Sequence, residues 1–486
     1  MRVLFYARGE EHLGVELLSA VLQRAGHTTG LVFDPGFDDV FLTRSRAGER
    51  VLEHLVAQAL AFKPDLVALS TMTLSYHAVR SFAQRLRQRR HIPTVAGGAH
   101  ATACPEQVVQ HEGIDMVVVG EGEHALLELV SRLGSPTLYD TPGLGHMQGG
   151  SYQQNPPGPA ITDLDSLPVP NKRQFQRKGT IRNRLTVIGS RGCRYGCSFC
   201  THSYLRGLFE ASGSPGPYWR VKSPGAYLDE IEQLQRQLGA RSVRFWDEIF
   251  GYDLDWLEEF CQGYRRRVGL PFSCTMHTAA VSERSVSLLA AAGCQNVAIG
   301  VESGSPRIRR TVHGRNTPDE TILEAARLIK RHGLALLTEN ILCVPGETPE
   351  DMNQTVALNQ AMGPRDAAAF IYFPFPRTAL FERCIADGSL APDTAAEIMA
   401  GSPRYNSWHK RTVLDHPHAD YAWSLKVLLP LIATRPRHEA LLRRIADTPH
   451  VNRLLFPLSL MHTDRTEFLQ KLRDYQRIAR RWQSTP

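Results

Sequence analysis

Short apolar runs alternate with amphipathic segments along the first 130 residues, and this alternation constrains the fold more than any other feature. The runs expected to be strands are Val3 to Tyr6, Gly30 to Phe33, Leu66 to Ser70, Thr94 to Ala96 and Met116 to Val119. Segments with helical spacing lie between them, notably 13–25, 49–62 and 77–89. Strand and helix repeated in this way predict a doubly wound parallel sheet, Rossmann-like and flavodoxin-like, with helices on both faces.

The loops that follow these strands form the expected ligand site, because such sheets bind ligands beyond the carboxyl ends of their strands. The candidate residues in these loops are Ser70, Thr71, Thr73, Gly97, Gly98, His100, Thr102, Gly120 and Glu121. The hydroxyl groups can hydrogen-bond a ligand, and paired glycines let a bulky ligand approach the backbone. Gly-Gly taken alone also makes an ordinary tight turn.

A change in composition divides the chain after this first domain, residues 1–134. Residues 135–182 are rich in Gly, Pro, Gln and Ser, which predicts an extended interdomain linker. Strand and helix then alternate again over residues 183–376, and six such units predict a partial (β/α)6 TIM-type barrel. Residues 377–486 have mainly helical spacing and predict a C-terminal helical module related to the substrate.

Three cysteines stand in one short loop directly after the first predicted barrel strand. Cys193, Cys197 and Cys200 have the spacing Cys-x₃-Cys-x₂-Cys. Three thiolates can hold three irons of a 4Fe-4S cluster and leave the fourth iron open for another ligand. The alternative is a structural zinc site completed by His202, but such sites usually place their ligands in two separated pairs.

Bulk composition excludes several functional classes. The chain has 486 residues, is 42% hydrophobic and 22% charged, and contains no run of 18 apolar residues, so a membrane span is not expected. The net charge of +7 is modest and its arginines are spread, which argues against nucleic-acid binding. Charged residues come too early at the amino end for a signal peptide, and we therefore expect a cytoplasmic protein.

The cysteine loop, with Phe199 before its last cysteine, resembles the signature of the radical S-adenosylmethionine enzymes. In that family the open iron binds S-adenosylmethionine, and one electron from the cluster cleaves it to a deoxyadenosyl radical. The resemblance implies that Asp247 and Glu248 lie near the amino group, that Glu302 with Ser303 contacts the methionine or ribose portion, and that Pro345 and Gly346 lie beside the adenine. Asp247 and Glu248 have an alternative role as helix caps, and Glu302 as the partner of an arginine such as Arg307.

The stretch from Gly97 to Thr102, followed some twenty residues later by Val-Val-Val-Gly-Glu-Gly-Glu, resembles the cobalamin-binding domain that precedes many radical S-adenosylmethionine enzymes. The Asp-x-His-x-x-Gly loop that gives histidine to cobalt in some cobalamin proteins is absent. His12 is the only histidine in the corresponding loop, at a different spacing from Gly14. Two alternatives remain: cobalamin bound without a histidine ligand, which we favour, and a domain that has lost its cofactor.

These resemblances, which span roughly residues 1 to 375, imply a cobalamin-dependent radical S-adenosylmethionine methyltransferase that modifies an unactivated carbon or phosphorus atom. The substrate is expected to be a small molecule such as a secondary metabolite, a lipid or a tetrapyrrole, and the electron donor a reductant such as flavodoxin or ferredoxin. Two alternatives stay open. One is a ring-forming, ring-rearranging or oxidative enzyme with the same cofactors, and the other is a plain radical oxidoreductase with an empty first domain.

Overall fold

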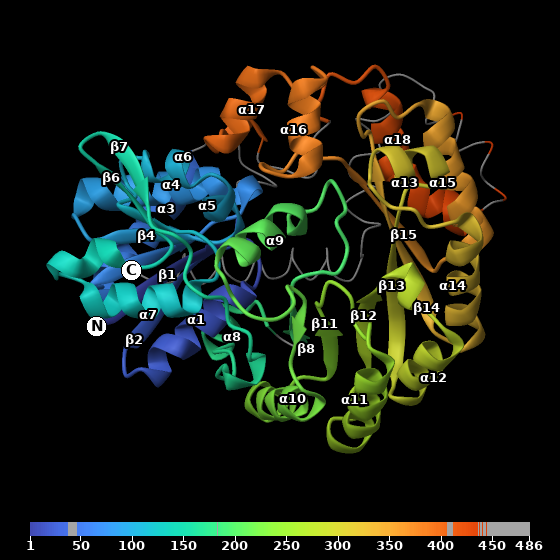
Figure 1. The fold of residues 1–486 in the computed structure, drawn as a ribbon, viewed down its shortest axis with the longest axis horizontal. Coiled ribbons are helices and arrows are strands. Elements are labelled where there is room, and N and C mark those ends of the chain that lie inside the picture. The colour runs from blue at the N-terminus through green and yellow to red at the C-terminus, as the bar shows by residue number, and fades with distance from the viewer. Residues whose placement is uncertain are drawn as a thin grey trace.

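The computed structural model describes residues 1–36, 46–181, 183–405 and 412–435, and the single residues 437, 440 and 444. Within these residues the chain folds around two large sheets, one in the amino-terminal part and one in the middle of the sequence (Figure 1). No helix in this part of the chain is long and apolar enough to cross a membrane.

The first sheet has the strand order β2-β1-β3-β4-β5-β6-β7, and its first five strands are parallel. The order 2-1-3-4-5 is that of flavodoxin-like folds, which confirms the predicted class. The strands are β1 (Arg2–Arg8), β2 (Thr28–Asp34), β3 (Leu66–Ser70), β4 (Thr94–Gly97), β5 (Met116–Val118), β6 (Leu144–Gln148) and β7 (Ser151–Gln154). The helices are α1 (Leu13–Arg24), α3 (Arg46–Phe62), α4 (Tyr76–Arg89), α5 (Ala99–Ala103), α6 (Pro105–Val109) and α7 (Gly122–Arg132).

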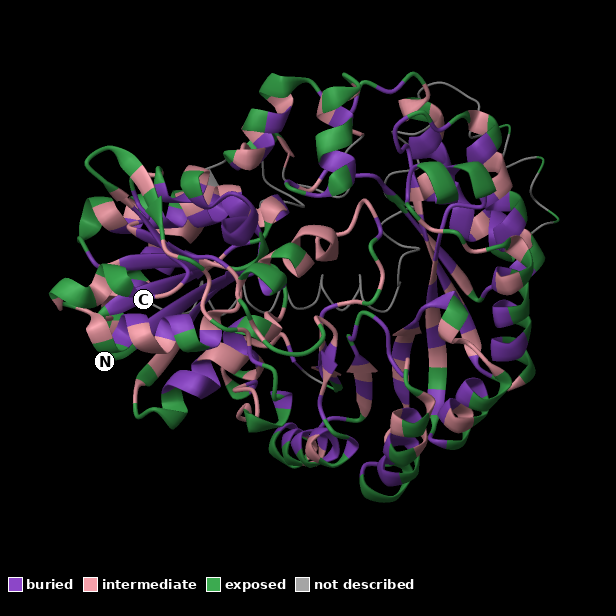
Figure 2. Ribbon diagram, viewed as in Figure 1, coloured by how far each residue is buried: buried purple, intermediate pink, exposed green. Residues whose placement is uncertain are grey.

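Both faces of this sheet are buried, as Figure 2 shows for its strands. Val3 and Phe5 of β1 belong to one apolar core, and their neighbours Leu4 and Tyr6 belong to another. Successive side chains of a strand point to opposite faces, so a strand covered by helices on both sides must be apolar throughout. This requirement explains the continuous apolar runs in the sequence.

The segment 135–182 differs from the extended linker that we expected. Strands β6 and β7 form a hairpin, and β6 pairs antiparallel with β5. The helix α8 (Arg173–Lys178) follows and inserts Phe175 into the core. An edge strand leaves backbone donors and acceptors unpaired, and the hairpin satisfies those of β5. The linker prediction is therefore wrong for residues 144–154.

The second sheet contains six parallel strands in the order β15-β14-β13-β12-β11-β8, which confirms the partial barrel. Its strands are β8 (Arg184–Val187), β11 (Ser242–Phe245), β12 (Phe272–Met276), β13 (Cys294–Glu302), β14 (Ala335–Leu342) and β15 (Asp366–Ile371). A short antiparallel ribbon joins β9 (Ser190–Arg191) to β10 (Arg220–Val221). The helices are α9 (His202–Ala211), α10 (Pro224–Leu238), α11 (Leu254–Arg267), α12 (Glu283–Ala291), α13 (Pro306–Thr311), α14 (Asp319–Arg331) and α15 (Pro349–Met362).

Three helices follow the barrel: α16 (Ala379–Ala386), α17 (Pro392–Met399) and α18 (Ala419–Thr434). Buried apolar residues of α18 pack with β15 and α15 in one core. The helices α16 and α17 lie between barrel and first domain in the view of Figure 1. The helical prediction holds for these residues, and most of the segment after Arg435 lies outside the described part of the chain.

Candidate active site

The cysteine loop lies between β9 and α9, beyond the carboxyl end of the first barrel strand. Cys197 is buried, and Cys193 and Cys200 are half-buried. The backbone N–H of Ser198 donates to the carbonyl of His313 at 3.1 Å, and the N–H of Leu380 donates to the carbonyl of Ser198 at 2.9 Å. Two segments far away in the sequence therefore fix the loop.

Arg315 contacts one of the three thiols directly. Its Nε donates a hydrogen bond to Sγ of Cys197 at 3.0 Å. Burial raises the pKa of the Cys200 thiol to about 12 and also raises that of Cys193. A metal would bind these sulfurs as thiolates, so binding must release protons. Three thiols with a guanidinium on one sulfur fit the donor set of an anionic iron–sulfur cluster.

The arrangement does not match a single-ion zinc site. No group of three His, Cys, Asp or Glu side chains among the described residues converges on the position of one metal ion. The two ring nitrogens of His202, the proposed fourth zinc ligand, contact Tyr218 Oη at 2.7 Å and Glu248 Oε1 at 3.1 Å. Cluster thiolates bind different irons and need not converge on one point. The structure therefore favours the cluster over the zinc alternative.

Glu302 at the end of β13 is tied to the cysteine loop through Arg315. Its Oε1 lies 3.2 Å from Nη2 of Arg315, whose Nη1 donates to the Gly300 carbonyl at 2.8 Å. Burial raises the pKa of Glu302 to about 7, against the opposing charge of Arg315. The alternative arginine named from the sequence, Arg307, instead pairs with Asp351. Ser303 is fully buried, and its hydroxyl accepts from the N–H of Ser305 at 3.1 Å, so it shapes the turn.

The two carboxylates after β11 have different surroundings. Asp247 is buried and accepts hydrogen bonds from the Gly189 N–H at 3.0 Å, the Ser190 hydroxyl at 2.5 Å and the Tyr227 hydroxyl at 3.3 Å. Its carboxylate is committed to the backbone of the neighbouring strand end, contrary to the expectation that it faces an amino group. Glu248 is the next residue, its side chain is 49% exposed, and it remains accessible to a ligand.

Phe199 and the Pro345–Gly346 turn complete the barrel side of the site. The Phe199 ring meets His313 edge-on, with centroids 5.1 Å apart. Gly346 has a φ of +67°, which favours glycine, and its carbonyl accepts from Arg307 at 2.9 Å. Glu347 accepts from the N–H groups of Cys343 at 2.5 Å and Val344 at 3.2 Å, and so holds the turn.

The paired glycines of the first domain have different roles. A Cβ on Gly98 would lie 2.7 Å from the Thr71 carbonyl oxygen, and its φ is +100°. A Cβ on Gly97 would meet nothing within 4 Å. Thr71 is buried, donates to the Gly97 carbonyl at 2.8 Å and accepts from the Ala101 N–H at 2.9 Å. Gly98 is therefore required by the fold. The space beside Gly97 is open and could receive a flat ligand.

Most polar candidates in these loops bond to the protein itself. Ser70 contacts His12 Nδ1 at 2.8 Å, and the other nitrogen of His12 contacts the Arg8 carbonyl at 2.9 Å. Thr73 contacts His100 at 3.2 Å. His100 is fully buried, and its second nitrogen lies 3.1 Å from the Met399 carbonyl after the barrel. Neither histidine has a free nitrogen to offer a metal.

The loop after β5, the last of the loops expected to bind cobalamin, contacts the barrel. Thr102 accepts from the N–H of Gly120 at 3.3 Å, and a Cβ on Gly120 would meet nothing within 4 Å. Glu121 pairs with Arg191 at 2.9 Å and Arg220 at 2.7 Å, both of which flank the cysteine loop. These cations lower the pKa of Glu121 against the effect of burial. Glu121 therefore joins the domains and is not free to bind a ligand.

Sequence reasoning missed two residues that the fold brings to the site. Arg315 follows Glu302 after a loop and a short helix, and only the tertiary structure shows its contact with Cys197. Tyr204 of α9 donates from its hydroxyl to the carbonyl of Ala99, next to Gly98, at 3.3 Å. An arginine and a tyrosine without a motif carry no sequence signal of such a role.

Comparisons with known proteins agree with this geometry. A B12 binding domain model matches residues 7–130, and a radical SAM superfamily model matches residues 187–358. The chain is similar to an uncharacterized methyltransferase from Pyrococcus horikoshii, with 28% identity over 339 residues that cover 68% of this chain and 71% of that protein. It is also similar to the anaerobic magnesium-protoporphyrin IX monomethyl ester cyclase of Cereibacter sphaeroides, with 26% identity over 388 residues, 76% of this chain and 59% of the cyclase.

The fold is shared with a solved structure. The radical S-adenosylmethionine methyltransferase TsrM from Kitasatospora setae superimposes with a TM-score of 0.64 and 20% identity, covering 80% of this chain and 77% of that one. The B12-binding match lies within the segment that forms the first sheet of this chain, and the radical SAM match covers most of the second. The chain therefore belongs to the radical S-adenosylmethionine enzymes that carry a B12-binding domain.

Proposed function

We propose that the chain is a cobalamin-dependent methyltransferase that transfers a methyl group to an unactivated carbon or phosphorus atom of a small molecule. The observation that carries this proposal is the contact between the two candidate sites. The helix α9 begins two residues after Cys200, and its Tyr204 donates to the Ala99 carbonyl in the glycine loop of the first domain. Both sheets thus present the carboxyl ends of their strands to a common space.

Cys193, Cys197 and Cys200 would hold the cluster, and the loops at Gly97 and Gly120 would receive cobalamin. When bound, the cluster supplies the electron for cleavage of S-adenosylmethionine, and cobalamin supplies the methyl carrier. Arg315 places positive charge on the Cys197 sulfur and orients Glu302. Glu248, half-exposed beside the cysteines, offers a carboxylate to the ammonium group of S-adenosylmethionine.

The test uses anaerobically reconstituted protein with cluster and hydroxocobalamin, methyl-labelled S-adenosylmethionine and a reductant. Candidate substrates are fractions of small-molecule extract, and products are detected by mass spectrometry. We expect a product that carries the labelled methyl group. Absence of bound cobalamin would contradict the cofactor assignment. If cobalamin binds but no product carries the labelled methyl group, methyl transfer is contradicted and the cofactor assignment stands.

A ring-forming reaction with the same cofactors is the second candidate. The similarity to the magnesium-protoporphyrin cyclase over 388 residues favours it. The two candidates differ in mass balance, because methyl transfer adds a carbon to the substrate and ring formation does not. Deoxyadenosine formation together with an unlabelled product would therefore identify the second candidate.

A further inference from the structure

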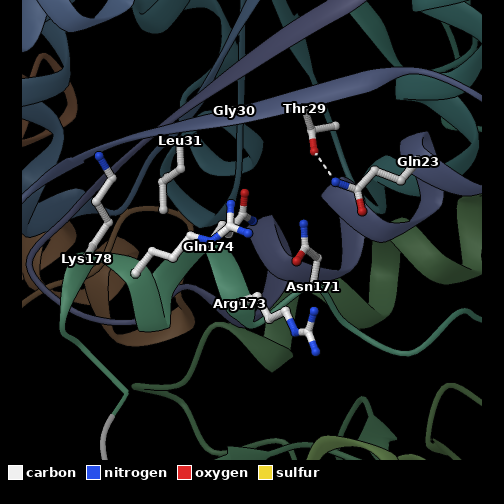
Figure 3. Close-up of a pocket in the computed structure, with 9 residues that line it drawn as sticks. Gln23, Thr29, Gly30, Leu31, Asn171, Arg173, Gln174 and Lys178 are labelled. Atoms are coloured by element: carbon white, nitrogen blue, oxygen red, sulfur yellow. Dashed lines mark hydrogen bonds between the residues drawn. The ribbon is translucent and has the colours of Figure 1, made fainter. Parts of the chain in front are cut away.

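A cavity of about 280 Å³ lies between the first sheet and α8. Thr29, Gly30 and Leu31, near the amino end of β2, form part of its wall. The cofactor loops follow the opposite, carboxyl ends of the strands. Figure 3 shows Lys178 at one end of the cavity, Gln23 and Asn171 at the other, and Gln174 between them. The cavity is thus separate from the candidate active site.

Three cations of one short helix line this cavity. Arg173, Arg177 and Lys178 all belong to α8, and no acidic residue is among the lining side chains. Arg173 and Arg177 are four residues apart on this helix, and both are exposed, so they border the cavity from its solvent side. No carboxylate in the described part of the chain pairs with any of the three. Among the described residues, Lys178 donates to the neutral Gln58 side chain, at 3.4 Å.

Neighbouring cations at the same domain junction are matched by carboxylates. Lys172, one residue before α8, contacts Glu11 and Glu16, each at 2.5 Å. Arg220 pairs with Glu121. The cations without a carboxylate partner are therefore confined to the cavity and are not general at this junction. Burial lowers the pKa of Lys178.

A neutral side chain in the wall also lacks a partner. Both polar atoms of the Gln174 amide are buried without a hydrogen bond to any described residue. A buried amide left without a hydrogen-bond partner destabilises the fold. Opposite it, the Thr29 hydroxyl is already fixed by Gln23 at 2.8 Å and by Ser19 at 2.7 Å. The wall thus combines ordered polar groups, unmatched cations and an amide without a partner.

We propose that this cavity binds a phosphate-bearing anion that holds α8 against the first sheet. Guanidinium groups bind phosphate in a bidentate manner, and a phosphate monoester carries nearly two negative charges at neutral pH. The volume has room for about nine water-sized groups, enough for a small phosphate monoester. Because α8 lies between the two domains in the sequence, the bound anion would stabilise their junction.

The test measures thermal unfolding of the full-length protein with inorganic phosphate or glycerol 3-phosphate, against chloride at equal ionic strength. Phosphate or glycerol 3-phosphate at millimolar concentration should raise the apparent Tm by at least about 2 °C, because a ligand of the native state stabilises it. An effect of phosphate identifies the free anion as ligand, and an effect of glycerol 3-phosphate alone identifies a monoester. No shift with either would overturn the proposal.

Variants locate the effect. The double substitution Arg177→Gln with Lys178→Gln should weaken phosphate binding, measured by titration calorimetry, at least tenfold. Arg177→Lys keeps the charge but loses the bidentate geometry, so it should weaken binding less than the double substitution does. The matched control, Arg265→Gln with Arg266→Gln on the exposed side of α11, also removes two positive charges and should bind as the unmodified protein does. Equal loss in both double variants would mean non-specific attraction and would overturn the site.

Discussion

The cysteine loop of the barrel and the glycine loops of the first sheet, the two proposed cofactor sites, are built in opposite ways. The barrel side presents side chains: three thiols, a guanidinium on one of them and the half-exposed carboxylate of Glu248. On the first-domain side, Thr71, His100 and Glu121 bond to the protein itself. What stays available there is backbone and open space, at Gly97 and Gly120.

This difference follows from the chemistry of the two ligands. An iron–sulfur cluster is held by covalent bonds from thiolates, so its site must be made of specific side chains. A large flat cofactor is held over an extended surface. Its site therefore needs backbone that the cofactor can approach closely and no side chains that protrude into its space. In the cysteine loop, substitutions that remove a side chain should therefore impair cofactor binding. In the glycine loops, substitutions that add a side chain should impair it.

Replacement of a cysteine should have the largest effect. Cys197→Ala removes one of the three proposed cluster ligands and the sulfur that accepts from Arg315. We expect loss of cluster absorbance and electron paramagnetic resonance signal, and no deoxyadenosine formation. Cys261→Ala, at a buried cysteine outside the loop, is the control and should retain the cluster. A cluster of normal intensity in the Cys197 variant would contradict the assignment.

Adding side chains to the two glycines should separate cofactor binding from stability. Gly97→Val places its Cβ where no neighbour lies within 4 Å, so the fold should persist while cobalamin binding weakens at least tenfold. Gly98→Ala forces a Cβ against Thr71 at a positive φ and should lower the free energy of unfolding by about 1–3 kcal/mol. Spectrophotometric titration with hydroxocobalamin and denaturant unfolding measure the two effects. Unchanged cobalamin affinity in the Gly97 variant would move the cofactor elsewhere.

Arg315 should tune the cluster. Arg315→Met removes a hydrogen bond and a positive charge from the Cys197 sulfur, which stabilise the reduced, more negative cluster. The reduction potential should fall by about 60 mV, one tenfold step for a one-electron couple. Redox titration followed by electron paramagnetic resonance measures it without any substrate. Arg315→Lys should lie between the two, and an unchanged potential in the Met variant would limit Arg315 to a packing role.

Glu347 should affect stability alone, and its effect should be visible in the pH dependence of unfolding. Burial raises its pKa from the ordinary 4.5 to about 8, so in this range the native state keeps a proton that the unfolded chain has lost. Its stabilising contribution is complete below pH 4.5 and is lost as the pH rises through about 8. Relative to Glu347→Gln, the unfolding free energy should fall by at most about 1.4 kcal/mol per pH unit in this window. Parallel curves for the two proteins would show that this carboxyl ionises freely.

The alternation of strands and helices predicted both sheets because burial on both faces demands continuous apolar runs, a local property of the sequence. The cysteine spacing predicted the cluster loop for a similar reason, since all three ligands lie within eight residues. The hairpin β6–β7 was not predicted, because its strands are polar and form only against the free edge of β5.

The surroundings of each residue at the strand ends could not be predicted from the sequence. Asp247 and Glu248 are adjacent, yet one is committed to Gly189 and Ser190 and the other stays accessible. Gly97 and Gly98 are adjacent and identical, yet only one is enclosed by Thr71. Such differences depend on which backbone lies opposite, a contact between segments distant in the chain.

The sequence by itself determined the fold class and the family and predicted the cysteine ligands, because each depends on residues close together in the chain. Only the tertiary structure decided that Arg315 contacts Cys197, that Tyr204 joins the two sites, and that unmatched cations of α8 face the first sheet. Electrostatic and hydrogen-bond contacts act over a few ångströms of space, and the chain must fold before residues far apart in sequence come within that distance.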